Sequence, residues 1–204
     1  MQTGRLEAFS DGVLAIIITI MVLELKIPEG EDFAALRHDA GTGLLTYLLS
    51  FVYVGIYWNN HHHMFQLTER VTGSVLWANL HLLFWLSLLP FTTAWMDDSG
   101  FARAPVMTYG VDLLAAAVAY FVLQSLIIGS QGSSSVLRRA VGRDLKGRLS
   151  PALYIAGIVC GAFISAGSVL PALLAMGWFV TAAVVWLVPD RRIERLVSER
   201  GRQE

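Results

Sequence analysis

Long runs of apolar side chains alternate with short polar segments along the whole chain. Six runs stand out, at residues 9–27, 44–58, 76–94, 106–128, 151–166 and 169–188. A membrane-spanning helix needs about 20 mainly apolar residues, so each run predicts one transmembrane helix. The second run is short and is expected to extend through Asn59 or Asn60, and the break between the last two rests on Gly167, Ser168 and Pro171. The pattern predicts an all-α integral membrane protein with one six-helix domain, residues 1–204, that ends in a tail at residues 189–204.

The first run begins close to the N-terminus, where a secretory signal peptide is the alternative to a retained helix. No small-residue cleavage pattern follows residues 25–28, and five further apolar runs come after this one. The sequence therefore favours a first helix that stays in the mature protein.

Composition supports the membrane assignment. Hydrophobic residues make up 55% of the chain and charged residues 15%, whereas charged residues reach about 25% in soluble domains. A formal net charge of -1 excludes a generally basic protein that coats nucleic acid, so no nucleic-acid partner is expected. A single cysteine, Cys160, excludes an intrachain disulfide and a cysteine-rich metal site.

The distribution of basic residues orients the six predicted spans. With the N-terminus in the cytoplasm, 12 of the 15 lysines and arginines fall inside: Arg5, Arg70, Arg138, Arg139, Arg143, Lys146, Arg148, Arg191, Arg192, Arg195, Arg200 and Arg202. Only Lys26, Arg37 and Arg103 fall outside, where the loops are acidic at Glu29, Glu31, Asp32, Asp39, Asp97 and Asp98. The positive-inside rule thus predicts a multi-pass protein of the cell membrane with both termini cytoplasmic.

The cytoplasmic C-terminal tail has two interpretations. Charged residues alternate with Ile193, Leu196 and Val197 over residues 190–204. This spacing fits a short amphipathic helix on the membrane surface, and the simpler alternative is a solubilising basic tail.

Polar side chains at membrane depth gather near the cytoplasmic ends of the first three spans. Polar groups in hydrocarbon are costly unless they are paired, so we expect a hydrogen-bonded network there. Its candidate members are Arg5, Ser10, Asp11, His61, His62, His63, Asn79 and His81, with Phe9 in the same segment of the first helix. Individual pairs do not follow from sequence alone.

The three consecutive histidines also raise the hypothesis of a zinc site. Neighbouring side chains on a helix point about 100° apart, and no cysteine or carboxylate nearby completes a tetrahedral set, so we expect no bound metal or other cofactor. The chain has no His-Glu-x-x-His pattern, no glycine-framed serine and no phosphate-binding loop. These observations argue against an enzyme.

Three further features have ordinary explanations. Residues 108–112, Thr-Tyr-Gly-Val-Asp, share letters with a potassium-channel filter, but the order is wrong and the segment opens an ordinary span. Gly157 and Gly161 form a GxxxG pattern that favours helix packing within the protomer. Asp112 lies about one turn below the external surface, where a partner or water can satisfy it, and a functional role is the less favoured alternative.

Several short motifs in the first half of the chain point to one family. The first helix opens with an Arg-x-x-x-Phe-Ser-Asp signature at Arg5, Phe9, Ser10 and Asp11. Further motifs follow at residues 58–62 (Trp-Asn-Asn-His-His), 79–81 (Asn-Leu-His) and 89–91 (Leu-Pro-Phe). Over about 95 residues, the chain resembles the transmembrane-protein-175 family of potassium channels.

This resemblance implies a potassium-permeable cation channel without a re-entrant filter. The single-repeat members of the family form homotetramers, and the first helix of each protomer lines the pore. The resemblance places the narrowest ring at Ile16 and a threonine that contributes to potassium preference at Thr19. Potassium and other monovalent cations are the implied permeant ions.

Helix geometry extends this assignment. At about 100° per residue, Ile16, Thr19, Ile20 and Leu23 share one face of the first helix, while Ser10 and Asp11 point away from it. Rings of these aliphatic side chains would gate the pore by dewetting when they close. Because the first helix is apolar on nearly every side, a buried or lipid-facing helix is the alternative to pore lining. The alternative functions are a secondary transporter, although the last three spans contain no counterpart of the Phe-Ser-Asp segment, and a non-conducting membrane interaction protein.

Overall fold

The computed structural model describes residues 3–132, 135–141, 145–165 and 168–187. The regular secondary structure of this part is helical, apart from an isolated bridge between Ser165 and Ser168. The helices are α1 (Thr3–Leu23), α2 (Phe33–Asp39), α3 (Gly41–Gln66), α4 (Gly73–Asp98), α5 (Arg103–Gln131), α6 (Val136–Val141), α7 (Leu145–Ala162) and α8 (Leu170–Leu187). The C-terminal tail, including its possible amphipathic helix, lies outside the described residues.

Five of these helices, α1, α3, α4, α5 and α8, are long and apolar enough to cross a membrane. The apolar part of α7, Leu149–Ala162, is shorter than a typical span. The prediction of an all-α membrane protein is therefore confirmed, with five candidate spans and one shorter apolar helix in the described part of the chain.

Helix ends differ from the predicted apolar runs in ways that local chemistry explains. α1 ends at Leu23, four residues before the predicted limit, because the chain then meets charged residues and Pro28, which disfavours helix in the residue before it. α3 instead continues to Gln66, eight residues past the end of the apolar run and beyond the expected extension through Asn59 or Asn60. A hydropathy pattern ends at the first polar residues, whereas the backbone hydrogen bonds of the helix continue through the histidine segment.

Capping side chains explain where two other helices begin. The Asp32 side chain accepts a hydrogen bond from the backbone N–H of Ala35 at 2.8 Å and starts α2, a short helix that the apolar pattern did not predict. Thr72 does the same for α4 by accepting from the N–H of Val75 at 3.3 Å. At the opposite end of α5, Gly132 with φ of 70° ends the helix, a conformation that favours glycine.

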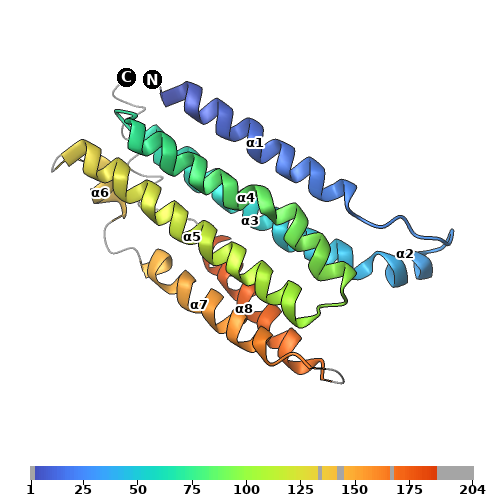
Figure 1. The fold of residues 1–204 in the computed structure, drawn as a ribbon. Helices are drawn as coiled ribbons and strands as arrows, with labels where there is room; N and C mark the ends of the chain where they lie inside the picture. The colour runs from blue at the N-terminus through green and yellow to red at the C-terminus, as the bar shows by residue number, and fades with distance from the viewer. Residues whose placement is uncertain (1–2, 133–134, 142–144, 166–167, 188–204) are drawn as a thin grey trace.

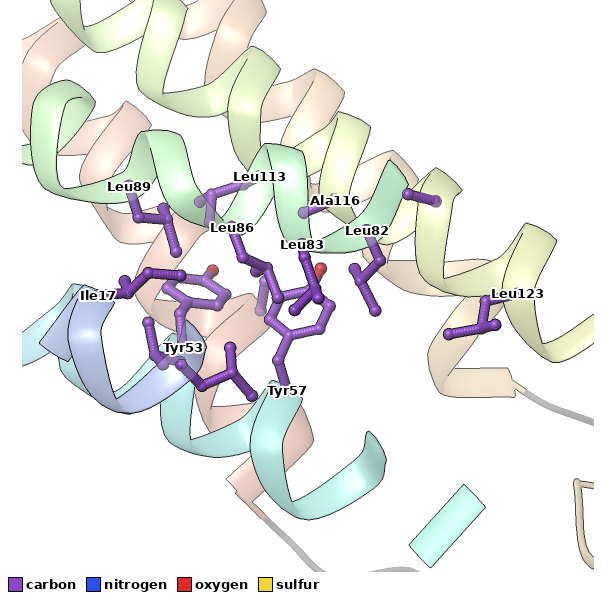
Figure 2. Packing of buried hydrophobic residues seen from close by; sticks show 14 of the residues in the cluster. Ile17, Tyr53, Tyr57, Leu82, Leu83, Leu86, Leu89, Leu113, Ala116 and Leu123 are labelled. Carbon is purple, nitrogen blue, oxygen red and sulfur yellow. The ribbon is translucent and has the colours of Figure 1, made fainter. Parts of the chain in front are cut away.

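α4 occupies the middle of the bundle, with α1, α3 and α5 packed around it, while α7 and α8 lie beyond α5 (Figure 1). Figure 2 shows the rings of Tyr53 and Tyr57 from α3 directed toward Leu83 and Leu86 of α4. Ile17 of α1 points into the same cluster. The core thus joins the first helix to the rest of the protomer through apolar contacts.

Buried glycines bring α5, α7 and α8 close together. A Cβ atom added to Gly157 would overlap the ring of Phe179, and one at Gly161 would lie 3.3 Å from the side chain of Met107. Gly110 is equally tight, with Phe179 and Ile158 each 2.7 Å from such an atom. The expectation that the GxxxG pattern serves packing within the protomer is confirmed.

Candidate functional site

α1 lies at the edge of the bundle and has two distinct faces (Figure 1). Its buried residues recur every three or four positions, which defines one side of a helix: Leu6, Ser10, Leu14, Ile17 and Met21. The other side is open. Ile16 is 58% exposed and Leu23 is 80% exposed, whereas Ile17 is 3% exposed. Ile16, Thr19, Ile20 and Leu23, the residues assigned to a pore, all lie on the exposed side.

Thr19 is the polar residue within that exposed set. Its hydroxyl donates a hydrogen bond to the backbone carbonyl of Ile16, one turn earlier, at 2.9 Å. Because the hydroxyl proton is held by the helix itself, the lone pairs of the oxygen remain free to face outward. This arrangement presents a hydrogen-bond acceptor, suited to a cation or to the water around it.

The buried side of α1 is held by a chain of hydrogen bonds to α4 and α3. The Asn79 side-chain amide donates to the Ser10 hydroxyl at 2.9 Å, and the Ser10 hydroxyl donates to the Leu6 carbonyl at 2.9 Å. The amide oxygen of Asn79 accepts from Nε2 of His61 at 2.8 Å. Because Ser10, Asn79 and His61 are buried, each of these hydrogen bonds replaces one that the group would make to water when exposed.

A second set of contacts ties α1 to α3. The Trp58 indole N–H donates to the Asp11 carboxylate at 3.1 Å, and Nδ1 of His62 donates to the Glu7 carboxylate at 2.6 Å. Nε2 of His62 in turn accepts from the Gln66 amide at 2.8 Å. Glu7 and Asp11 are four residues apart on α1, and their partners His62 and Trp58 are four residues apart on α3 in the reverse order. Antiparallel helices require this reversal. Together the two sets fix both the rotation and the register of α1.

The other predicted network members lie at its margin. Arg5 and Phe9 are exposed, and His63 is half-buried. His81 is exposed and accepts from the indole of Trp85 on its own helix at 2.9 Å. Within the described part of the chain, Nδ1 of His61 and Nδ1 of His63 are buried without a hydrogen-bond partner.

Sequence reasoning missed three partners in these contacts, Glu7, Trp58 and Gln66. The signal was nevertheless present as helical spacing. Glu7 and Asp11 are four residues apart, and Gln66 follows the Trp58–His62 pair by one further step of four. Residues four apart lie on one face of a helix, so two such faces can meet along antiparallel helices.

Among the described residues, no group of three or more histidine, cysteine, aspartate or glutamate side chains could hold a metal ion. Asp112 is 3% exposed, and one of its carboxylate oxygens accepts from the Thr92 hydroxyl at 3.1 Å. Its other oxygen is buried without a partner in the described part of the chain. These contacts link α5 to α4 within the bundle.

The opposite end of α1 is rich in charge. Lys26 forms an ion pair with Asp98 at 2.8 Å, and this hydrogen bond, together with the attraction between the two charges, raises the pKa of Lys26. Nearby, hydrogen bonds from His38 and from the backbone N–H of Glu29 lower the pKa of Asp39. Glu24, at the end of α1, is exposed. This end of α1 therefore has exposed carboxylates close to the exposed apolar residues of the helix.

Comparison with known proteins places these features in a family. Residues 5–90 match the family model described as endosomal/lysosomal potassium channel TMEM175. A potassium channel of Chryseobacterium sp. (strain P1-3) is 51% identical over 199 residues, which cover 98% of this chain and 100% of that protein.

More distant relatives carry the same family name. The TMEM175 protein of Danio rerio, named an endosomal/lysosomal proton channel, is 31% identical over 62% of this chain and 24% of its own length. The crystal structure of a lysosomal potassium-selective channel TMEM175 homolog from Chamaesiphon minutus superposes with a TM-score of 0.73 at 28% identity. It covers 92% of this chain and 97% of that one. The family is one of ion channels and not of enzymes. This chain belongs to the TMEM175 family of potassium channels.

Proposed function

We propose that this protein is a potassium-permeable cation channel without a re-entrant filter, in which α1 from each of four protomers lines the pore. In this arrangement Ile16 forms the narrowest ring, Ile20 and Leu23 form further apolar rings, and Thr19 contributes to potassium preference. The protomer has six spans, with α7 as the shorter fifth, and both termini lie in the cytoplasm of a cell-membrane protein. The permeant ions are potassium and other monovalent cations.

The observation that carries the proposal is the two-sided character of α1. For an apolar helix whose outer face meets only lipid, apolar packing against the bundle would suffice. α1 is instead held at defined positions by buried polar bonds through Ser10 and by the Asp11 and Glu7 contacts. Polar bonds in hydrocarbon fix a helix in one orientation because breaking them leaves unpaired groups. A fixed orientation is what a ring of identical side chains around a symmetry axis requires.

Packing of the exposed residues around an axis gives a mechanism for opening and closing. Isoleucine side chains cannot replace the hydration shell of an ion, so a close ring expels water and blocks conduction. A small dilation of the ring lets water return, and hydrated or partly hydrated potassium then passes. Selectivity in such a pore is modest and arises near Thr19, whose oxygen lone pairs face outward.

Charges at the ends of the pore assist conduction. Carboxylates such as Glu24 and those of the loop between α1 and α3 raise the local cation concentration at the mouth. This contribution is electrostatic, and it weakens as salt rises because the Debye length shortens to about 8 Å at physiological ionic strength.

Flux through reconstituted protein tests the proposal. Purified protein in liposomes should carry potassium down its gradient without a coupled ion. The fluxes of sodium and caesium, measured in the same way, should be smaller than that of potassium. A secondary transporter would instead need a second ion gradient for net flux, and an interaction protein would give no flux above empty liposomes. Either result would contradict the channel assignment.

A further inference from the structure

A large groove lies between α3 and α8, apart from the exposed face of α1. It has a volume of about 1110 Å³, and its lining at one end comes from the α4–α5 turn and from Ser165 and Ser168. Pockets that hold drug-sized ligands measure about 300–1,000 Å³, so this space is large enough for a long flexible molecule. Its walls are mostly apolar and include Leu48 from α3 with Leu173 and Val184 from α8. Leu173 is 64% exposed in the protomer.

This end of the groove is polar. Thr42, Ser99, Arg103, Ser165 and Ser168 line it, and the elements that carry them meet at one end of the bundle (Figure 1). Among the described residues that line the groove, Arg103 is the one charged side chain and there is no carboxylate. Within the described residues Arg103 forms no ion pair. Its positive charge is therefore available to a ligand in the groove.

The start of α5 adds to this positive character. Arg103 is the first residue of α5, and Ala102 before it provides no capping side chain. The first N–H groups of a helix have no partner within it, and the helix dipole concentrates positive potential there. In α5 these donors are the N–H groups of Arg103 and Ala104, because Pro105 has no N–H and the N–H of Val106 donates to the Ala102 carbonyl. The groove thus combines a side-chain cation and these two backbone donors with hydroxyl groups at one end, and a long apolar wall beyond them.

We propose that the groove binds a phospholipid with an anionic headgroup, taken from the leaflet at this end of the bundle. The headgroup phosphate lies at Arg103 and the first turn of α5, and one acyl chain lies along α3 and α8. The wall on α3 runs from Thr42 to Val52. At about 1.5 Å per residue this is about 15 Å, half the roughly 30 Å hydrocarbon core. One leaflet therefore matches the length of that wall, and the absence of carboxylates from the lining favours an anionic headgroup over a zwitterionic one.

The test titrates the purified full-length protein in detergent with phosphatidylglycerol or with phosphatidylcholine of identical chains. Native mass spectrometry counts the bound lipids, and tryptophan fluorescence reports the shift in Tm. Wild-type protein should prefer phosphatidylglycerol. Arg103→Gln should weaken phosphatidylglycerol binding about tenfold, the scale of one charge-assisted contact, and change phosphatidylcholine binding less than twofold. Arg37→Gln, which removes an exposed charge on α2 outside the groove, is the matched control and should bind as wild type does.

A second pair of variants tests the acyl-chain part of the groove. Leu173→Trp fills it and should reduce binding of both lipids, whereas Leu174→Trp alters the neighbouring exposed residue, which does not line the groove, and should have no effect. Equal lipid binding by Arg103→Gln and Arg37→Gln would overturn the proposal. So would a Leu173→Trp variant that binds lipid normally but loses its oligomeric state, because a second copy of the chain would then be the occupant.

Discussion

Neighbouring residues on α1 have opposite environments. Ile16 is exposed and its successor Ile17 is buried, because about 100° of helical rotation separates them. Similarly, Ser10 is fully buried and bonded to Asn79, whereas Thr19 is exposed and bonded only to its own helix. Residues with these two environments should respond to substitution in different ways, some through stability and others through conduction.

Thr19→Val should lower the potassium-over-sodium preference and leave a working pore. Valine is nearly isosteric but has no oxygen to present, and an exposed position contributes little to folding. Thr92→Val is the control: its hydroxyl bonds the buried Asp112, so its loss should cost about 1–3 kcal/mol of stability without changing selectivity. Reversal potentials and Tm measured for both variants check this. An unchanged preference in Thr19→Val would remove Thr19 from the selectivity mechanism.

Asn79→Leu should destabilise the protein by about 1–3 kcal/mol, because the buried Nε2 of His61 loses its acceptor and Ser10 loses a donor. His81→Leu, two residues along the same helix but exposed, should change stability by less than about 0.5 kcal/mol. Thermal unfolding in detergent compares the two variants. If both lose the same stability, the buried chain of hydrogen bonds does not hold α1.

At the scale of helices, the tight approach of α7 to α8 depends on glycine. Gly157→Ala places a methyl group against the Phe179 ring, and overpacking of this kind costs about 1–3 kcal/mol. Gly177→Ala on α8 meets no atom within 4 Å and should be neutral or stabilising by about 0.5–1 kcal/mol. Chemical or thermal unfolding distinguishes the two. A Gly157→Ala variant as stable as Gly177→Ala would show that the helices separate easily.

Helix cores followed from apolar runs, but their ends and partners did not. The apolar pattern gave the middle of α3 and stopped at Trp58, because hydropathy does not show that His61 to His63 continue the helix. α2 was missed because a seven-residue helix started by Asp32 has no apolar run. The pairing of Ser10 with Asn79 depends on how two helices rotate against each other, which a single sequence does not specify. The exposed face of α1 was identified only through the family resemblance, because the helix carries apolar side chains on nearly every side.

For the whole molecule, the distribution of basic residues predicts which loops face outside. In a background with Cys160→Ala, cysteines at Glu31 and Asp98 should react with a membrane-impermeant maleimide added to intact cells. A cysteine at Arg143, in the most basic connection, should react only after the membrane is opened. Labelling of the Arg143 position in intact cells would contradict the predicted topology.

If α1 lines a pore around a symmetry axis, Ile16 and Ile17 should respond in opposite ways to substitution. Potassium current per reconstituted protein should be measured for Ile16→Ala, Ile16→Asn and Ile17→Ala beside wild type. Shortening Ile16 removes apolar bulk from every protomer at one level, and asparagine adds polar groups that favour a wetted constriction, so both variants should conduct more.

Ile17→Ala should instead lose core packing, at a cost of about 2–5 kcal/mol, and lower the yield without raising current. The predicted result is increased conductance in both Ile16 variants and wild-type conductance in the surviving Ile17→Ala protein. Wild-type current in Ile16→Ala together with a large increase in Ile17→Ala would contradict the account, because the pore would then lie on the other face of α1.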